Sequence, residues 1–159
     1  PFMYGYPEIQ EMSLAAIRRL NEDNIKCCIL TKGQLTIELK DLYSENEYGI
    51  TLVSLDEDYR EKIEPGAESL KALNEAGCKT WVSIEPYPTP NLIDQNIGEI
   101  LEAVSFADRI IFGRMNYNKT VSAYKENKQF YNECAEEVIA FCEGRGISYP
   151  IKAKTQTKE

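Results

Sequence analysis

The chain contains 159 residues, of which 43% are hydrophobic and 28% are charged. These values predict a folded domain with a sizeable core and argue against disorder. No apolar run approaches the roughly 18 residues that a membrane-spanning helix requires, so we expect no membrane contact. The net charge of -8 argues against bulk, sequence-independent binding to nucleic acid, although it leaves room for a small basic pocket.

Histidine is absent, which excludes histidine-based acid/base catalysis and histidine-ligated metal sites. The five cysteines are Cys27, Cys28, Cys78, Cys134 and Cys142. An odd number without a CxxC pair favours buried thiols in a reducing compartment over a disulfide framework. We therefore expect a cytoplasmic protein.

Helical and strand-like periodicities alternate along the chain. In chain order, the first half predicts a helix over 8–21, a strand over 25–31, a helix over 34–43, a strand over 48–55, and helices over 57–63 and 69–76. The second half predicts a strand over 79–84, a helix over 91–107, a strand over 109–112, a helix over 123–142 and a strand over 148–153. The first helix should bury one apolar face, formed by Ile9, Met12, Ala16, Ile17 and Leu20.

Strands separated by helices predict right-handed βαβ crossovers and a parallel sheet. We expect one α/β domain over residues 1–154 with about five parallel strands, and a polar tail over 155–159. An open doubly wound sheet and part of a (β/α) barrel both fit this pattern.

Every predicted strand is apolar in its body and polar at its carboxyl end. The polar side chains at these ends are Lys32, Ser54, Asp56, Ser83, Glu85, Arg114, Asn116, Lys152 and Lys154. Ligands of parallel α/β folds bind at this edge, and this set suits a small ligand that carries both an amine and a carboxylate. The alternative interpretation is that these ends are polar only because the chain reaches water there.

The third strand ends in VSIEP. Ser83 and Glu85 should share one face of the sheet, because successive side chains of a strand alternate. Pro86 should stop strand pairing just after Glu85 and hold that residue in an extended conformation. The strand end would therefore aim the carboxylate in a fixed direction.

Four motifs, in chain order, resemble those of the radical SAM superfamily: ILTKG, ITLVSLDEDYREKIEPGA, ALNEAGCKTWVSIEP and ADRIIFGRMN. Within it they are most similar to spore photoproduct lyase-like proteins, often labelled DNA repair photolyase-like. The resemblance runs from Pro1 to about Asn116. It implies the C-terminal half of a radical SAM core: a partial (β/α) TIM-like barrel that uses S-adenosylmethionine (SAM) and a 4Fe-4S cluster, with a nucleic-acid lesion as a candidate substrate.

The resemblance also implies roles for the strand ends. Lys32 would neutralise the methionine carboxylate of SAM, and Ser54 would bond that carboxylate or a ribose hydroxyl. Glu85, with Ser83 behind it, would accept a bond from the ribose or face the substrate. The remaining pair would line the far wall of the pocket: Arg114 and Asn116. No catalytic residue and no metal ligand is assigned in this chain.

Two departures from the family stand out. The CxxxCxxC motif that holds the cluster is absent, so we expect it in a preceding segment and expect this fragment alone to be inactive. The connection EPGA-ESLKAL is also several residues shorter than in the relatives. It reflects either a true deletion or a missing loop.

Two other classes of protein remain open at this stage. The first is a metal-free (β/α)-barrel lyase or isomerase in which Lys32 forms a Schiff base. The second is a non-catalytic α/β binding module. In either class, the exposed edge of a partial barrel would favour self-association.

Overall fold

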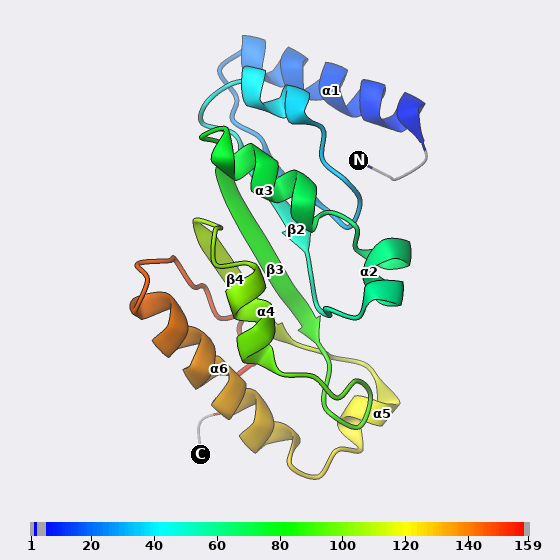
Figure 1. Cartoon of the computed structure of the whole chain (residues 1–159), viewed down its shortest axis with the longest axis vertical. Helices are drawn as coiled ribbons and strands as arrows, with labels where there is room; N and C mark the ends of the chain where they lie inside the picture. Colours follow the sequence, from blue (N-terminus) through cyan, green and yellow to red (C-terminus); the bar gives the residue numbers. More distant parts are fainter. Residues whose placement is uncertain (1, 3–5, 158–159) are drawn as a thin grey trace.

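Four parallel strands form one sheet, in the order β1-β2-β3-β4, in a computed structural model that describes residues 2 and 6–157. The strands are β1 (Cys28–Thr31), β2 (Glu47–Thr51), β3 (Lys79–Tyr87) and β4 (Arg109–Arg114). The helices are α1 (Pro7–Glu22), the 3-10 helix η1 (Ile37–Asp41), α2 (Glu57–Ile63), α3 (Ala67–Glu75), α4 (Ile97–Ala103), α5 (Lys119–Ser122) and α6 (Asn127–Glu143). Helices and strands alternate as the sequence predicts (Figure 1).

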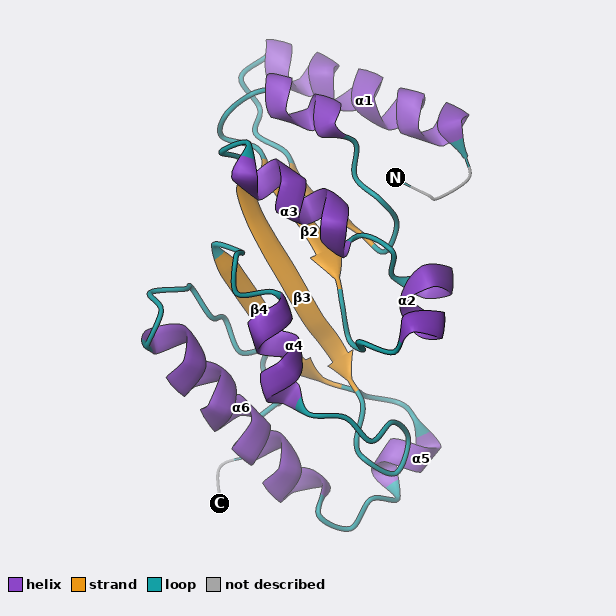
Figure 2. Cartoon of the chain, viewed as in Figure 1, coloured by secondary structure: helices purple, strands orange, loops and turns teal. Residues whose placement is uncertain are grey.

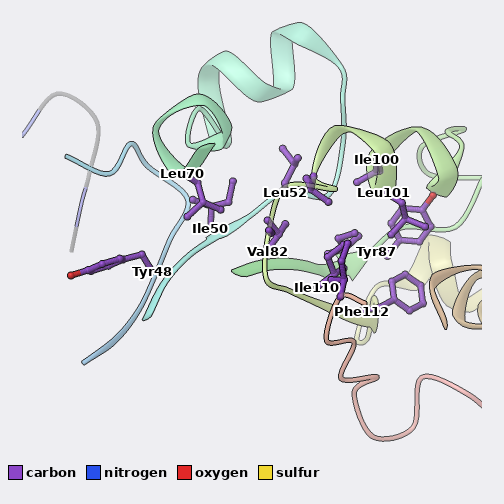
Figure 3. Close-up of a cluster of buried hydrophobic side chains, with 14 of the residues drawn as sticks. Tyr48, Ile50, Leu52, Leu70, Val82, Tyr87, Ile100, Leu101, Ile110 and Phe112 are labelled. Atoms are coloured by element: carbon purple, nitrogen blue, oxygen red, sulfur yellow. The ribbon is translucent and has the colours of Figure 1, made fainter. Parts of the chain in front are cut away.

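The core lies between one face of the sheet and the helices that cover it (Figure 2). Val82 and Ile110, at the centre of β3 and β4, have no exposed surface. Leu70 of α3 and Leu101 of α4 pack on the same side and are also fully buried. Figure 3 shows this cluster extending from β2 to the aromatic side chains near the end of the sheet. Burial of this apolar layer stabilises the fold and fixes which strand residues face away from it.

A glycine ends α3 as the sequence predicts. Gly77 has a φ of 85°, which glycine adopts without steric cost. Its N–H donates to the carbonyl of Asn74 at 2.8 Å, and the N–H of Cys78 donates to the carbonyl of Leu73 at 3.0 Å. This pair of bonds is a Schellman motif, which satisfies the last carbonyls of the helix and turns the chain into β3.

Two predicted helices differ from the structure. The helix expected over 91–107 begins only at Ile97, because the side chain of Asn96 accepts a bond from the N–H of Gly98 at 2.7 Å and caps the helix there. The segment 34–43 forms a short 3-10 helix, which begins after the capping residue Thr36. Apolar spacing alone does not locate such capped starts.

The last predicted strand, over 148–153, forms only two isolated parallel bridges to β4, at Ser148 and Ile151. The expected count of about five strands therefore becomes four strands and one loosely paired segment. Among the described residues β1 pairs only with β2, so the sheet does not close. The arrangement is an open part of a (β/α) barrel. No helix in the described part of the chain has the length and apolarity needed to cross a bilayer.

The apolar face predicted for α1 is only partly buried. Leu14 and Ile17 pack into the core, whereas Met12 and Leu20 are 68% and 42% exposed. The described chain contacts one side of this helix, so the remainder of the apolar stripe faces outward. At the start of the chain, four of the eight residues of the segment PFMYGYPE, 1 and 3–5, lie outside the described residues.

Candidate functional site

The face of the sheet turned away from the helices carries the polar strand residues, and we call it the inner face. Because side chains alternate, the buried Val82 and Ile84 place Ser83 and Glu85 on this face, as predicted. The same alternation places Gly113 of β4 beside them, since Phe112 belongs to the core. The inner face therefore presents a hydroxyl and a carboxylate at the carboxyl end of β3.

Glu85 lies against a neighbour without a side chain. A Cβ at Gly113 would approach the Glu85 Cδ to 2.7 Å, so only glycine lets the carboxylate rest across β4. Its Oε2 lies 3.5 Å from the Nζ of Lys152, which the sequence placed on the same polar edge. Ser83, on the same face, is 5% exposed. The carboxylate is thus held at a partly exposed position.

Strand β3 does not stop at Glu85, contrary to the prediction. It continues through Pro86 to Tyr87, whose partner is Arg114 of β4 after an irregularity in the register. The carbonyl of Tyr87 accepts bonds from the N–H of Met115 at 3.0 Å and from the hydroxyl of Tyr131 at 2.7 Å. Pro86 has no N–H to donate, and pairing between β3 and β4 resumes at Tyr87.

Lys32, after β1, is held by a carboxylate that the sequence analysis did not assign. Its Nζ lies 2.5 Å from Oε1 of Glu64, which has no exposed surface. The other oxygen, Oε2, accepts the backbone N–H of Val53 at 2.8 Å. Glu64 therefore connects the ends of β1 and β2. The sequence signal that could have identified it is an acidic residue in the motif EPGA, where the chain leaves an otherwise exposed helix.

Ser54 lies apart from both pairs. It is 2% exposed, and its Oγ accepts the N–H of Asp56 at 3.2 Å. It lines a cavity of about 540 Å³ between α2 and the start of α4, together with the carboxylates of Asp56, Asp94 and Glu99. Such an acidic lining favours an amine or hydroxyl donor over a carboxylate.

Arg114 and Asn116 form a third group. The Nε of Arg114 donates to Oδ1 of Asn116 at 2.9 Å, so the structure brings this predicted pair together. Alternation from the buried Phe112 places Arg114 on the helix side of the sheet, opposite the face of Glu85. Both residues line a cavity of about 770 Å³ beside α5 and the start of α6.

At the opposite end of the inner face, a charged pair lies over an aromatic ring. Arg109 donates to Glu47 and stacks over Trp81 at 5.5 Å from the ring centroid. The hydrogen bond from Arg109 lowers the pKa of Glu47 below its ordinary value, and burial opposes this effect only in part. Since this end of the strands lies away from the carboxyl edge, we assign it a structural role.

The cysteines do not form a metal site in this part of the chain. All five are free thiols, and burial raises the pKa of Cys134 to about 12 and that of Cys142 above its usual range. Among residues 2 and 6–157, no three acidic or cysteine side chains are placed to share a metal ion. The described residues therefore do not fit a 4Fe-4S cluster, and we derive no step through one.

No known family model matches the sequence, and no curated protein matches it. Solved structures of SuiB from Streptococcus suis share the fold. The SAM-bound form is 18% identical, covers 84% of this chain and superimposes with a TM-score of 0.59. The form bound to the precursor peptide SuiA is 19% identical, covers 94% and has a TM-score of 0.58.

The likeness to SuiB shows a shared fold. It supports the partial barrel over an open doubly wound sheet, the alternative that the sequence left open. The present chain spans about a third of the SuiB chain, 33% in the SAM-bound form and 36% in the peptide-bound form. The partner named for SuiB is a peptide, so the expectation of a nucleic-acid lesion gains no support from these structures.

Proposed function

We propose that this chain is the C-terminal part of a radical SAM enzyme and that SAM lies at the carboxyl ends of β1, β2 and β3. The observation that carries the proposal is the fold shared with SAM-bound SuiB over 84% of the chain. The motifs ILTKG and EPGA support it, because Lys32 and Glu64 from these two motifs meet at 2.5 Å. The assignment to spore photoproduct lyase-like proteins rests on sequence resemblance alone.

The side chains at this edge fit the chemistry of SAM. Lys32 is half exposed and supplies a cation for the methionine carboxylate. Glu85 is partly exposed and supplies an acceptor for ribose hydroxyls or the amine. Ser83 adds a hydroxyl on the face of Glu85, whereas Ser54 lines the separate acidic cavity between α2 and α4. When bound, SAM would supply the radical chemistry of the reaction, with the electron coming from a donor outside this chain.

The work of this chain would be to orient SAM and to keep its charged groups away from water. Glu64 holds Lys32 in place, and Gly113 leaves room for the carboxylate of Glu85. Cluster ligands would come from residues outside this sequence, because the described cysteines do not fit that task. The chain would then be inactive by itself.

Calorimetric titration of SAM tests the binding role of Lys32. Lys32→Ala should weaken SAM binding by about 1.5–3 kcal/mol, the range for a hydrogen bond to a charged group. Lys62→Ala is the matched control, because Lys62 is an exposed lysine of α2 paired only with Asp58. Unchanged SAM affinity in Lys32→Ala would refute its role.

A second experiment tests the class of enzyme. The longer protein should carry CxxxCxxC upstream, and anaerobic reconstitution should yield 5′-deoxyadenosine from SAM. If neither is found, the radical interpretation fails. Borohydride trapping of a carbonyl ligand on Lys32 would then support the metal-free lyase, and its failure would leave the binding module.

A further inference from the structure

The cavity beside α5 and the start of α6 is a separate feature of the carboxyl edge and does not depend on the proposed cofactor. It measures about 770 Å³ and lies between the exit of β4, the connection from α5 to α6, and the segment 153–154. Four cationic residues line it: Arg114, Lys125, Lys128 and Lys154. One carboxylate, that of Glu126, shares the lining and accepts a bond from the hydroxyl of Tyr124 at 3.4 Å.

These four cations differ from most others in the chain because they have no acidic partner. Ten lysine and arginine side chains in the described residues form ion pairs. The described cations without an ion pair are Lys40, Lys71, Arg114, Lys119, Lys125, Lys128 and Lys154. Four of these seven line one cavity, in a protein whose net charge is -8. An acidic chain that gathers four of its seven described unpaired cations around one cavity concentrates positive potential there.

The orientation of Arg114 adds geometry to this charge. Its Nε donates to Asn116, which fixes the guanidinium at one edge and leaves the terminal nitrogens for another acceptor. A planar guanidinium held in this way binds the paired oxygens of a phosphate or carboxylate. Because the lining carries four cations against one carboxylate, a group with two negative charges balances it better than a single carboxylate does.

Two residues of the lining also have unusual backbone conformations. Three described non-glycine residues have a positive φ: Asn24, Tyr117 and Lys154. Tyr117 (60°) and Lys154 (68°) both line this cavity, and the side chain of Tyr117 is fully exposed at its edge. Such conformations cost free energy and are concentrated at ligand sites.

We propose that this cavity binds the phosphate group of a small phosphorylated ligand. Arg114 is the bidentate donor, and Lys125, Lys128 and Lys154 surround the phosphate oxygens. A phosphate ester carries about two negative charges at neutral pH, which suits this lining. The assignment gives Arg114 and Asn116 a ligand other than SAM, in agreement with their place on the helix side of the sheet.

Titration of the chain with inorganic pyrophosphate, by calorimetry and by ³¹P resonance, tests the proposal. Arg114→Gln combined with Lys128→Gln should weaken binding about tenfold or more, since each residue contributes a charge-assisted bond. The matched control is Lys40→Gln combined with Lys71→Gln, which removes the same charge from unpaired lysines outside the cavity. The control should retain its affinity, and circular dichroism should show both proteins folded.

Three outcomes would overturn the proposal. The first is no pyrophosphate binding at millimolar concentration. The second is an equal loss of affinity in the control, which would show that binding depends only on the net charge of the protein. The third is tighter binding of a pentaglutamate peptide with the same dependence on Arg114, which would assign the cavity to acidic peptides. SAM is titrated separately on the same proteins, so an absence of SAM binding would not affect the test of the phosphate site.

Discussion

At the residue scale, Glu64 is the side chain on which the proposed SAM site depends most. It is fully buried, and its two oxygens bond different segments, Lys32 after β1 and Val53 after β2. If a neutral group replaces the buried carboxylate of Glu64, the charge of Lys32 is no longer compensated. We therefore expect the carboxyl ends of β1 and β2 to lose their local structure before the core unfolds.

We expect Glu64→Gln to lower the free energy of unfolding by about 1–3 kcal/mol, because a buried charged hydrogen bond is weakened. The same change should weaken SAM binding, since Lys32 loses the acceptor that positions it. Urea denaturation measures the first effect and calorimetry the second. Glu61→Gln, on the exposed surface of α2, is the control. Wild-type SAM affinity in Glu64→Gln would contradict the positioning role.

A pH dependence follows from Glu47. Its pKa is lowered from 4.5 by the hydrogen bond from Arg109. A carboxyl group whose folded pKa is depressed stabilises the fold above its unfolded pKa and loses that contribution as pH falls through the folded value. The difference in unfolding free energy between wild type and Glu47→Gln should be constant near neutral pH and should narrow below pH 4.5. A difference in unfolding free energy that widens below pH 4.5 would contradict this prediction.

At the scale of elements, sequence patterns located the bodies of four strands but not all strand and helix ends, since β2 ends at Thr51 and α4 begins at Ile97. The alternation of VSIEP predicted the face of Ser83 and Glu85 correctly, because side-chain period in a strand is a local property. The start of α4 at Ile97 depends on which of several polar residues caps the helix, a choice made by tertiary packing. The motif EPGA could have marked Glu64 as a candidate site residue, but not as the partner of Lys32, since 32 residues of chain separate the two.

Gly113 gives a prediction about the contact between β3 and β4. In Gly113→Ala, the new Cβ would lie 2.7 Å from Glu85, so the carboxylate must move away from the inner face. We expect weaker SAM binding and little loss of stability, because the atoms in the way belong to the flexible end of a partly exposed side chain. Gly144→Ala, at the end of α6, has contacts no closer than 3.4 Å and should change neither. Unaltered SAM affinity in Gly113→Ala would remove Glu85 from the proposed site.

At the scale of the whole molecule, the sheet is open and β1 pairs with β2 alone among the described strands. Leu30 of this strand is 42% exposed. A free strand edge with an apolar side chain favours pairing between copies. We expect the 159-residue chain to self-associate as its concentration rises.

Sedimentation velocity at increasing concentration measures this association. Leu30→Lys should shift the population toward monomer, because a charge on an edge strand opposes pairing between sheets. Leu92→Lys is the control, as Leu92 is 40% exposed in a connection outside the sheet. An equal effect in both variants would exclude the edge of β1 as the contact.

The two proposed sites also differ in the timescale on which their backbones open. Ser83 of β3 is paired with Thr51 of β2 and with Ile111 of β4, whereas Glu85 lies in the irregular part of the β3–β4 register. Tyr117, Lys125 and Lys154 belong to connections outside the ladder. Amide exchange with heavy water should therefore be slow beneath the first site and fast around the second. The strand beneath the proposed SAM site would thus be ordered before a ligand arrives, whereas the connections around the cationic cavity would become ordered around the phosphate as it binds.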